Sequence, residues 1–530
     1  MSAYLNDVAD SEAPVPQFDD IQGLILRGYN FDYIRYLIFT IDANNVDGAR
    51  ELIGKLLPGS NSLLNITTAA PWPDDEKPPY CLNIGVTSFG LNLLIGQKNY
   101  TDVKFASFPL FSLYDGGAAT NAASVGDTDD SAPVKWWKRS GGWQSPADPK
   151  PDGSDLHIQL TIYTQSEGER NTYYDKLMGM IPVKNNVPAL TLAFLKDSNP
   201  LLTGINYIHF GYKDSFSQPR LSKVPWNTKQ QRLLKGVSTI DDRPIVPPYQ
   251  FVIQKKYKDD KENLVPNYYA HPLILNGSFA AFRLLYQDVK AFNAFINKTP
   301  GVDPALVAAK MCGRWFDGTP LVVSPNGPKE GLKDFDYTNF NYIEPTTNQQ
   351  GVRENDSLGQ LCPYASHIRR TNPRDDAAVV GNQNNPDGSL NYASTRRIMR
   401  RAGAYGPDYV EGEADGIQRG LVGLFICANL QSQFQFIMQS WITRNGFRTT
   451  DASPNASGFD PLFGPPNAKV DAYNEFAYLP DGSTKQPYEQ IHGLERFIRT
   501  DGSLFLFLPG IAALKCLSQG IVPPTPKPTL

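Results

Sequence analysis

Histidine is scarce in this chain of 530 residues, so a histidine-dependent cofactor site has few candidates. The five histidines are His157, His209, His271, His367 and His492. His367 stands in LCPYASHIRRTNPR (361–374), after small and apolar residues and before Arg369, Arg370 and Arg374. An imidazole can ligate iron, and guanidinium groups can neutralise the two propionates of haem b. The alternative interpretation is a basic turn at the surface.

The segment CPYASHIRRTNPR closely resembles the proximal-histidine segment of the dye-decolorizing peroxidases, in which Cys-Pro-x-x-x-His-x-Arg-x-x-x-Pro-Arg recurs. The resemblance implies that His367 is the axial ligand of the iron and that Arg374, seven residues later, approaches a propionate. It also implies haem b (iron protoporphyrin IX) held without covalent bonds. The chain has no Cys-x-x-Cys-His motif for covalent attachment.

A second segment, YIHFGYKDSFSQP (207–219), resembles the family signature His-Phe-Gly-x-x-Asp-Gly-x-Ser-Gln-Pro. By position, Asp214 is the distal aspartate of that signature. Ser215 replaces the second glycine, and if this position needs a positive φ, serine adds strain and can shift the carboxylate. Without the resemblance, an aspartate after Gly-Tyr-Lys would be interpreted as a turn residue.

A third segment, RRIMRRAGAYGPDY (396–409), is similar to the family pattern Ile-x-Arg-x-Gly-x-x-Tyr-Gly-Pro. The similarity identifies Arg400, six residues before Gly406, as the distal arginine. We expect the neighbouring Arg401 to point away from the haem. Further matches in DDIQGLILRGYN, GFDPLFG and LFLFLPG extend the resemblance over most of the chain and favour a fungal-like member of the family.

Two other family positions shape the expected pocket. In GFDPLFG (458–464), the resemblance makes Asp460 the hydrogen-bond partner of His367, which would fix the imidazole tautomer and strengthen its donation to iron. Leu421 matches a wall residue of the distal pocket. Gly423 falls where fungal members often carry phenylalanine, so we expect wider access to the iron.

The resemblance predicts a peroxidase that reduces hydrogen peroxide and oxidises dyes, phenols and similar aromatic donors in one-electron steps, through Compound I. Asp214 would take a proton from one peroxide oxygen and return it to the other, and Arg400 would stabilise the charge on the leaving oxygen. A carboxylate stays ionised in acid, which predicts an acidic optimum. Tyr405 and Trp441 match family positions where surface aromatic residues relay electrons from bulky donors. Mn(II) is a further candidate donor.

Strands and helices alternate along the chain and form two similar halves. Strand-then-helix patterns occur at 33–57, 80–96 and 156–178, then again at 278–300 and 420–442, and a last strand is expected at 503–510. The helices are too few to cover both faces of a wide parallel sheet, which favours an α+β fold of two ferredoxin-like sandwiches, of the dimeric α/β barrel type. We expect an N-terminal domain, 1–235, that carries Asp214 and a C-terminal domain, 236–530, that carries His367 and Arg400.

Composition limits the possible partners. The formal net charge is -4 and the longest basic runs are pairs, which excludes nucleic acid. Nowhere do 18 apolar residues follow one another, and no basic stretch precedes an apolar one at the start, so we expect a soluble chain that is cytoplasmic, or secreted if this is a mature form. The five dispersed cysteines argue against a disulfide framework. Either a monomer or a homodimer fits this sequence.

Three other functions remain open at this point. A non-enzymatic haem carrier or iron-release protein would keep His367 but would not need Asp214 and Arg400 together. A haem-free interaction protein could retain the duplicated sandwich as a scaffold. Chlorite-dismutase-like chemistry on a related double sandwich would not require the aspartate signature.

Overall fold

The structure is a computed structural model, and most of the chain is described. The described residues are 15–72, 76–108, 110–221, 224, 245–254, 270–332, 337–338, 340–343, 346–348, 351–353, 356–376, 396–413, 416–445, 447, 458–464, 475–480 and 489–524.

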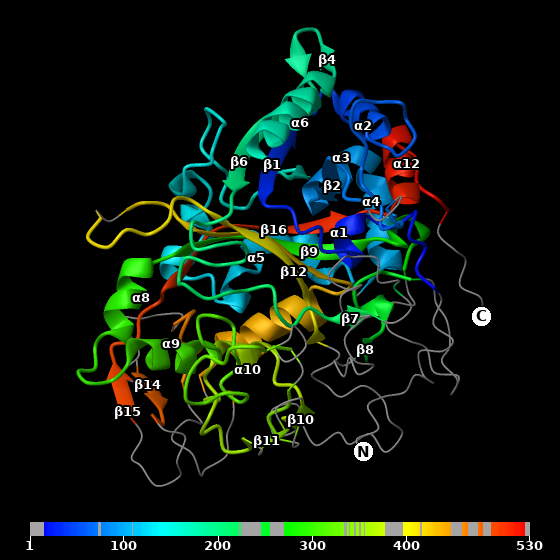
Figure 1. Ribbon diagram of the computed structural model, residues 1–530. Coiled ribbons are helices and arrows are strands. Elements are labelled where there is room, and N and C mark those ends of the chain that lie inside the picture. Colours follow the sequence, from blue (N-terminus) through cyan, green and yellow to red (C-terminus); the bar gives the residue numbers. More distant parts are fainter. Residues whose placement is uncertain are drawn as a thin grey trace.

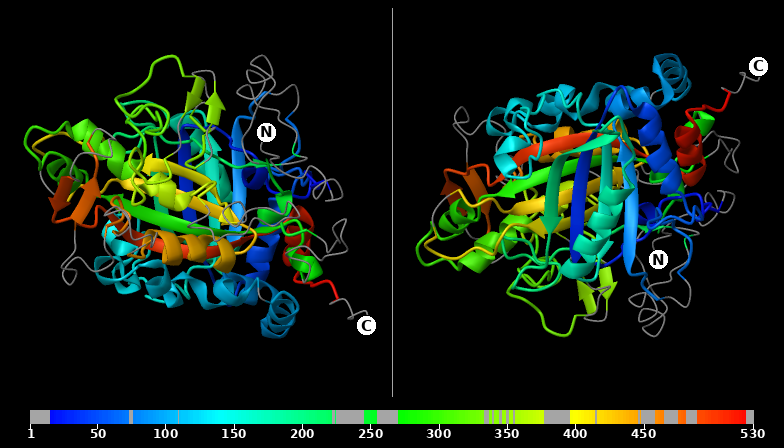
Figure 2. Two further views of the ribbon diagram at one scale, coloured as in Figure 1. Left: turned by 90° about the horizontal axis from the view of Figure 1, so that it is seen from below. Right: turned by 90° about the horizontal axis from the view of Figure 1, so that it is seen from above.

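One antiparallel sheet of eight strands organises the described chain (Figure 1). Its strands are β1 (Tyr33–Ile41), β2 (Tyr80–Val86), β3 (Ile158–Thr164), β6 (Leu190–Ser198), β9 (Ser278–Gln287), β12 (Met399–Tyr405), β13 (Gly420–Cys427) and β16 (Ile498–Leu508). They are arranged in the order β12-β13-β9-β16-β2-β3-β1-β6. The N-terminal strands therefore form one end of the sheet and the C-terminal strands form the other. The view from above in Figure 2 shows the N-terminal strands side by side.

The two ends of the sheet have the same internal topology. Counted within its own half of the chain, each set of four strands lies in the order second, third, first, fourth. In both halves a helical segment follows the first strand and another follows the third, as in a ferredoxin-like βαββαβ unit. These segments are α2 (Val46–Lys55) and α6 (Glu167–Met180) in the first half, and α8 (Val289–Ile296) with the π-helical η9 (Gln431–Gln435) and η10 (Ile437–Ile442) in the second. The α+β fold of duplicated ferredoxin-like sandwiches is confirmed.

The halves meet at a narrow junction between strands. β16 pairs with β2 at a single position, Phe507 opposite Val86. Nearby, Arg283 donates hydrogen bonds to the buried carboxylate of Asp127 at 2.7 Å and to Thr500 Oγ1 at 2.8 Å. The C-terminal helix α12 (Ile511–Gln519) packs on α2 of the first half (Figure 1). The division at residue 235 remains a proposal, because that position lies outside the described residues.

Local sequence accounts for where several helices begin and end. Ser166 caps α6 by accepting a hydrogen bond from the backbone N–H of Glu169, and Glu169 accepts one from Gln165 N–H in return. Helix α9 (Pro304–Cys312) begins with a proline after the capping residue Asp303, and it ends at Gly313, whose φ is +94°. The turn that follows α9 lies beside the loop that carries Asp214.

The remaining elements are short. The other α-helices are α1 (Gly23–Leu26), α3 (Ser88–Ile95), α4 (Gln97–Ala106), α5 (Ser112–Thr120) and α10 (His367–Thr371). The two-stranded pairs are β4 (Val183–Lys184) with β5 (Val187–Pro188), β7 (Arg220–Leu221) with β8 (Ile245–Val246), β10 (Thr346–Asn348) with β11 (Gly351–Arg353), and β14 (Glu475–Tyr478) with β15 (Glu489–His492). The stretch 115–155, expected to be irregular, holds the end of α5 and four short 3₁₀ turns, which are η2 (Ala122–Val125), η3 (Asp129–Ser131), η4 (Pro133–Lys135) and η5 (Lys138–Ser140). None of the described helices is long and apolar enough to span a membrane.

Two strands of the sheet, β6 and β12, were not expected from the sequence. In β12 (MRRAGAY) two adjacent arginines interrupt the apolar alternation that marks a strand. β12 nevertheless pairs with β13 along its whole length, from Met399 opposite Ile426 to Tyr405 opposite Gly420. Because successive side chains of a strand point to opposite faces, Arg400 and Arg401 lie on opposite faces of the sheet.

In the part of the chain that the structure describes, the buried apolar side chains form three clusters. The largest spans both halves of the sheet and contains aromatic residues from each, such as Phe279 and Phe507, whose ring centroids are 5.7 Å apart. A second cluster lies among α8, α9, β14 and β15 in the C-terminal half, with Ala365 and Leu462 as members. Since these two residues flank His367 and Asp460 in sequence, this second cluster forms the apolar wall of the site described next.

Candidate active site

Asp214 and Arg400, which are 186 residues apart in sequence, form an ion pair. The Arg400 Nη1 donates to Asp214 Oδ1 at 2.9 Å, and Arg400 Nη2 donates to the backbone carbonyl of Phe216 at 2.8 Å. Gln218 connects the same segments through hydrogen bonds to the backbone N–H and carbonyl of Arg400, both at 3.3 Å. By contrast, Arg401 points to the other face of the sheet and donates to the carbonyl of Leu24 at 2.8 Å. The structure thus brings the predicted distal pair together.

The Asp214 carboxylate is partly exposed and partly surrounded by protein. Its side chain is 40 % exposed and that of Arg400 is 34 % exposed, yet protein surrounds the carboxylate closely enough that desolvation is the largest influence on its pKa. Desolvation acts to raise that pKa. The charge of Arg400 and the hydrogen bonds from Ser215 N–H and from Arg400 act against it, and the pKa of Asp214 is lowered overall. Asp214 is therefore a carboxylate that stays ionised in mild acid.

The backbone around Asp214 is strained. Ser215 has a φ of +77° and Ser217 has a φ of +59°, a region that serine adopts at a cost. The expectation that the signature glycine occupies a position of positive φ is confirmed at Ser215. Strained backbone of this kind persists only where surrounding contacts hold it in place.

His367 and Asp460 form the other side of the site. His367 is the first residue of α10, and its Nδ1 lies 2.7 Å from Asp460 Oδ2. The Asp460 side chain is fully buried, and its other oxygen accepts a hydrogen bond from Leu462 N–H at 3.0 Å. Among the described residues, no hydrogen-bond partner contacts His367 Nε2. With Nδ1–H donating to a carboxylate, Nε2 carries the lone pair that a metal ligand needs.

The two sides lie within electrostatic reach of one another. The charge of His367 is among the causes that lower the pKa of Asp214. Both the His367 side chain, 26 % exposed, and the Asp214 side chain keep accessible surface although apolar clusters surround them. An imidazole nitrogen without a described partner, close enough to a carboxylate–guanidinium pair to influence its charge, fits a haem that is bound through one axial nitrogen.

Arg374 lies between the loop that carries Asp214 and the end of α10. It donates to the carbonyls of Thr338 at 3.0 Å and Phe340 at 2.8 Å, and to Ser217 Oγ at 3.3 Å. Its backbone φ is +55°. This position beside Ser217 is compatible with the predicted contact to a haem propionate, which remains a proposal.

Strand β13 places Leu421 and Gly423 on the same face of the sheet as Arg400. Leu421 is opposite Ala404 on β12 and packs at the margin of the apolar cluster around the site. A Cβ atom at Gly423 would lie 2.4 Å from the Cα atom of Ala402 and from the carbonyl oxygen of Arg401. A side chain at residue 423 therefore requires the backbone of β12 to move, and the pocket has no side chain at this point.

The expected surface positions of Tyr405 and Trp441 are wrong. Tyr405 is 1 % exposed and Trp441 is 4 % exposed, so neither ring reaches the surface. Tyr405 ends β12 on the face away from Arg400, where Lys196 Nζ lies 4.9 Å from its ring. Trp441 lies in the core-facing π-helical segment η10 and packs edge-on against Phe436. Any role in electron transfer remains a proposal and would need a further, exposed residue.

Several residues that organise the site were not identified from the sequence. His209 donates from Nε2 to the carbonyl of Tyr405 at 2.9 Å and so ties the Asp214 loop to β12. Gln218, on the same loop, donates to the carbonyl of Arg400, and Arg314 donates to Ser217 of that loop. Gln218 belongs to the quoted signature, and that was the available signal. Nothing in the sequence connects Arg314, almost 100 residues later, with that loop.

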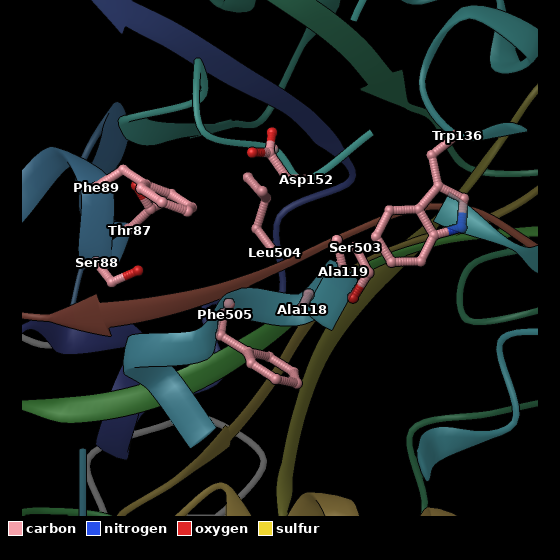
Figure 3. A pocket seen from close by; sticks show the side chains of 12 residues that line it. Thr87, Ser88, Phe89, Ala118, Ala119, Trp136, Asp152, Ser503, Leu504 and Phe505 are labelled. Carbon is pink, nitrogen blue, oxygen red and sulfur yellow. The ribbon is translucent and has the colours of Figure 1, made fainter. Parts of the chain in front are cut away.

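A small pocket elsewhere in the molecule contains none of the predicted site residues (Figure 3). It lies beside β16 and is lined by residues that include Thr87, Phe89, Trp136, Asp152 and Leu504. The polar side chains in this pocket include no arginine, lysine or histidine. The lining of this pocket therefore offers no axial nitrogen for a haem and no cation for its propionates.

Comparison with known proteins agrees with this geometry. No protein-family model matches the chain. The dye-decolorizing peroxidase of Auricularia auricula-judae is 29% identical over 510 residues, which cover 94% of this chain and 86% of the relative. The dye-decolorizing peroxidase of Mycena epipterygia is 24% identical over 558 residues, which cover 98% of this chain and 92% of the relative.

Solved structures show the same fold. A crystal structure of DyP aligns with a TM-score of 0.70 at 22% identity and covers 94% of this chain and 98% of that one. The fungal DyP-type peroxidase from Auricularia auricula-judae aligns with a TM-score of 0.68 at 21% identity and covers 96% of this chain and all of that one. The chain is thus similar over almost its whole length to fungal dye-decolorizing peroxidases, and it has the fold of the solved DyP structures.

Proposed function

We propose that this protein is a haem peroxidase that reduces hydrogen peroxide and oxidises dyes, phenols and similar aromatic donors. The observation that carries the proposal is the ion pair of Asp214 and Arg400 within electrostatic reach of His367, whose Nδ1 is held by Asp460. A haem carrier needs only the histidine side of this arrangement. The relatives named as dye-decolorizing peroxidases support the enzymatic interpretation.

The cofactor that fits these residues is non-covalent haem b. His367 would supply the axial nitrogen, Asp460 would hold its tautomer and Arg374 would neutralise a propionate. When bound, the haem iron supplies the redox chemistry by which peroxide is reduced and donors are oxidised.

Asp214 transfers the proton of the peroxide, and Arg400 stabilises the negative charge that develops. Asp214, ionised in mild acid, accepts a proton from one oxygen of hydrogen peroxide and returns it to the oxygen that leaves as water. Arg400 is permanently cationic and directs fixed N–H donors at the space beside Asp214, where negative charge develops. Since Arg400 is already paired with Asp214 and with the Phe216 carbonyl, it needs little reorganisation during the reaction.

The donor site is less specified by the structure. A related dye-decolorizing peroxidase has been solved in complex with 2,6-dimethoxyphenol, which makes this phenol a suitable probe. For Mn(II), no group of three His, Cys, Asp or Glu side chains that could hold a metal occurs among the described residues.

The test is reconstitution of the full chain with haem. We expect wild type to develop a Soret band, to consume hydrogen peroxide at acidic pH and to oxidise 2,6-dimethoxyphenol. His367→Ala should fail to develop the wild-type Soret band while keeping the circular dichroism spectrum of the folded chain. A Soret band without peroxide consumption in wild type would instead indicate a haem carrier, and no haem uptake would refute the cofactor assignment.

A further inference from the structure

We propose that Arg314 is a positioning residue that holds the strained loop carrying Asp214 in its reactive conformation. The proposal rests on the function proposed above and adds a residue that does not itself face the reacting oxygen atoms. It starts from the departure at Ser215, where serine replaces the signature glycine and takes a φ of +77°. Contacts elsewhere must compensate for this conformation.

The turn that follows α9 contacts the loop on both sides of Asp214. Before Asp214, the N–H of Lys213 donates to the carbonyl of Phe316 at 2.8 Å. After it, Arg314 Nη2 donates to Ser217 Oγ at 3.0 Å. The side chain of Phe216, between these two contacts, lies against Gly318 of the same turn, where an added Cβ would be 2.1 Å from the Phe216 ring.

Arg314 makes three further contacts, of which the one to the Phe216 ring reaches the loop. Its Nη1 donates to the carbonyls of Gly318 at 2.9 Å and Tyr337 at 2.7 Å, which fixes the guanidinium plane. The guanidinium carbon lies 5.2 Å from the centroid of the Phe216 ring. The Phe216 ring also stacks on the ring of Tyr337, with the two centroids 4.8 Å apart and an angle of 14° between the ring planes. One arginine thus fixes both the ring of Phe216 and the hydroxyl of Ser217, the two residues that follow Ser215.

The charge of Arg314 is not used in an ion pair with any described carboxylate. Its side chain is buried, with 5 % exposed, and burial, followed by the charge of Arg374, lowers its pKa to about 10. A buried guanidinium without a counter-ion is costly, so a methionine would satisfy packing alone more easily. What methionine cannot provide is the fork of donors that reaches Gly318, Tyr337 and Ser217 together.

The path from Arg314 to the reaction is short. The carbonyl of Phe216, whose ring lies against the Arg314 guanidinium, accepts the hydrogen bond from Arg400 Nη2. A shift of Phe216 therefore moves the partner of Arg400 as well as the carboxylate of Asp214. Displacement of a catalytic group by about 1 Å can lower a rate by about 100-fold.

The test compares Arg314→Met, Ser215→Gly and the double variant in the haem-reconstituted full chain. We expect Arg314→Met to slow the reaction with peroxide by about 10- to 100-fold and to leave KM for 2,6-dimethoxyphenol unchanged. Ser215→Gly added to Arg314→Met should restore most of the loss, because glycine adopts a positive φ without strain. Arg170→Met, a matched control that removes a buried arginine of the N-terminal half, should keep the wild-type rate.

Hydrogen–deuterium exchange gives a second readout that does not depend on activity. Peptides that cover 210–221 should exchange faster in Arg314→Met, return to wild-type exchange in the double variant and be unchanged in Arg170→Met. If wild type binds haem but ignores peroxide, the proposed function fails and exchange alone decides the inference. If Arg314→Met does not fold, Phe216→Leu removes the same contact from the loop side and should show the same slow reaction and rescue. A wild-type rate in either variant, or a loss that Ser215→Gly does not restore, would overturn the proposal.

Discussion

The two sides of the active site, His367 with Asp460 and Asp214 with Arg400, differ in burial and in backbone strain. On the His367 side, Asp460 is fully buried, its carboxylate is held by His367 and by the backbone N–H of Leu462, and the second apolar cluster surrounds the pair. On the Asp214 side, both charged groups keep a third or more of their surface accessible and the backbone is strained. Residues that hold a haem ligand need a fixed geometry, whereas residues that react with peroxide need space for that molecule. Contacts outside the space for peroxide must therefore hold Asp214 and Arg400 in place.

The largest expected effect of a single substitution in the reaction is at Asp214. Asp214→Asn should slow the reaction with peroxide by about 10²- to 10⁴-fold, because the amide cannot accept and return a proton. Haem binding should be unchanged, since the ligand side is untouched. Stopped-flow absorbance with peroxide at acidic pH measures the rate. Asp197→Asn, which alters an ion pair with Arg35 in the N-terminal half, is the control, and equal rates in the two variants would contradict the role of Asp214.

Arg400→Leu should follow, with a loss of about 10²- to 10³-fold in the same rate, because fixed donors for the developing charge are removed. Arg401→Leu is a strict control, since it removes an adjacent arginine that points to the other face of the sheet. We expect that control to lower the melting temperature but not the rate for the folded protein. If both variants lose the rate equally, the distinction between the two faces of β12 is wrong.

Asp460→Asn should have a smaller effect, and this effect should be on how firmly the haem is held. The amide keeps the size of the carboxylate but weakens the hydrogen bond to His367 Nδ1, and loss of such a partner costs about 10- to 100-fold in affinity or activity. We expect faster loss of haem to an acceptor apoprotein, which is followed through the Soret band. Haem retention equal to that of wild type would show that Asp460 does not support the ligand.

The smallest effect concerns pH. The pKa of Asp214 is lowered, so its ionised form persists above that pKa and is lost as the pH falls through it. We expect the wild-type rate with peroxide to hold as the pH falls past the ordinary pKa of an aspartate and to fall only below it. The titratable and charged groups that influence Asp214 are Arg400, His367 and Cys312. In Arg400→Leu the fall of the rate at low pH should begin at a higher pH, because the cation that lowers the pKa of Asp214 is gone. A fall at the same pH as in wild type would mean that another group titrates.

Much of the site could be predicted from short segments of sequence. The segments around Asp214, His367, Arg400 and Asp460 each resemble family patterns, and the structure pairs Asp214 with Arg400 and His367 with Asp460. The duplicated fold also followed from the alternation of strands and helices. The strand β12 could not be predicted, because adjacent arginines obscure its alternation, although one of them is a site residue.

Residue types and local order were determined by the sequence itself: which histidine has arginines nearby, which aspartate follows the Gly-Tyr-Lys turn, and that a serine stands where glycine is usual. Tertiary structure alone decided which residues compensate for that serine, since Arg314 reaches Ser217 across 97 positions of the chain. It also decided that Tyr405 and Trp441 are buried. Contacts between segments distant in sequence depend on how the sheet and helices pack, and packing leaves no local pattern from which such contacts could be read.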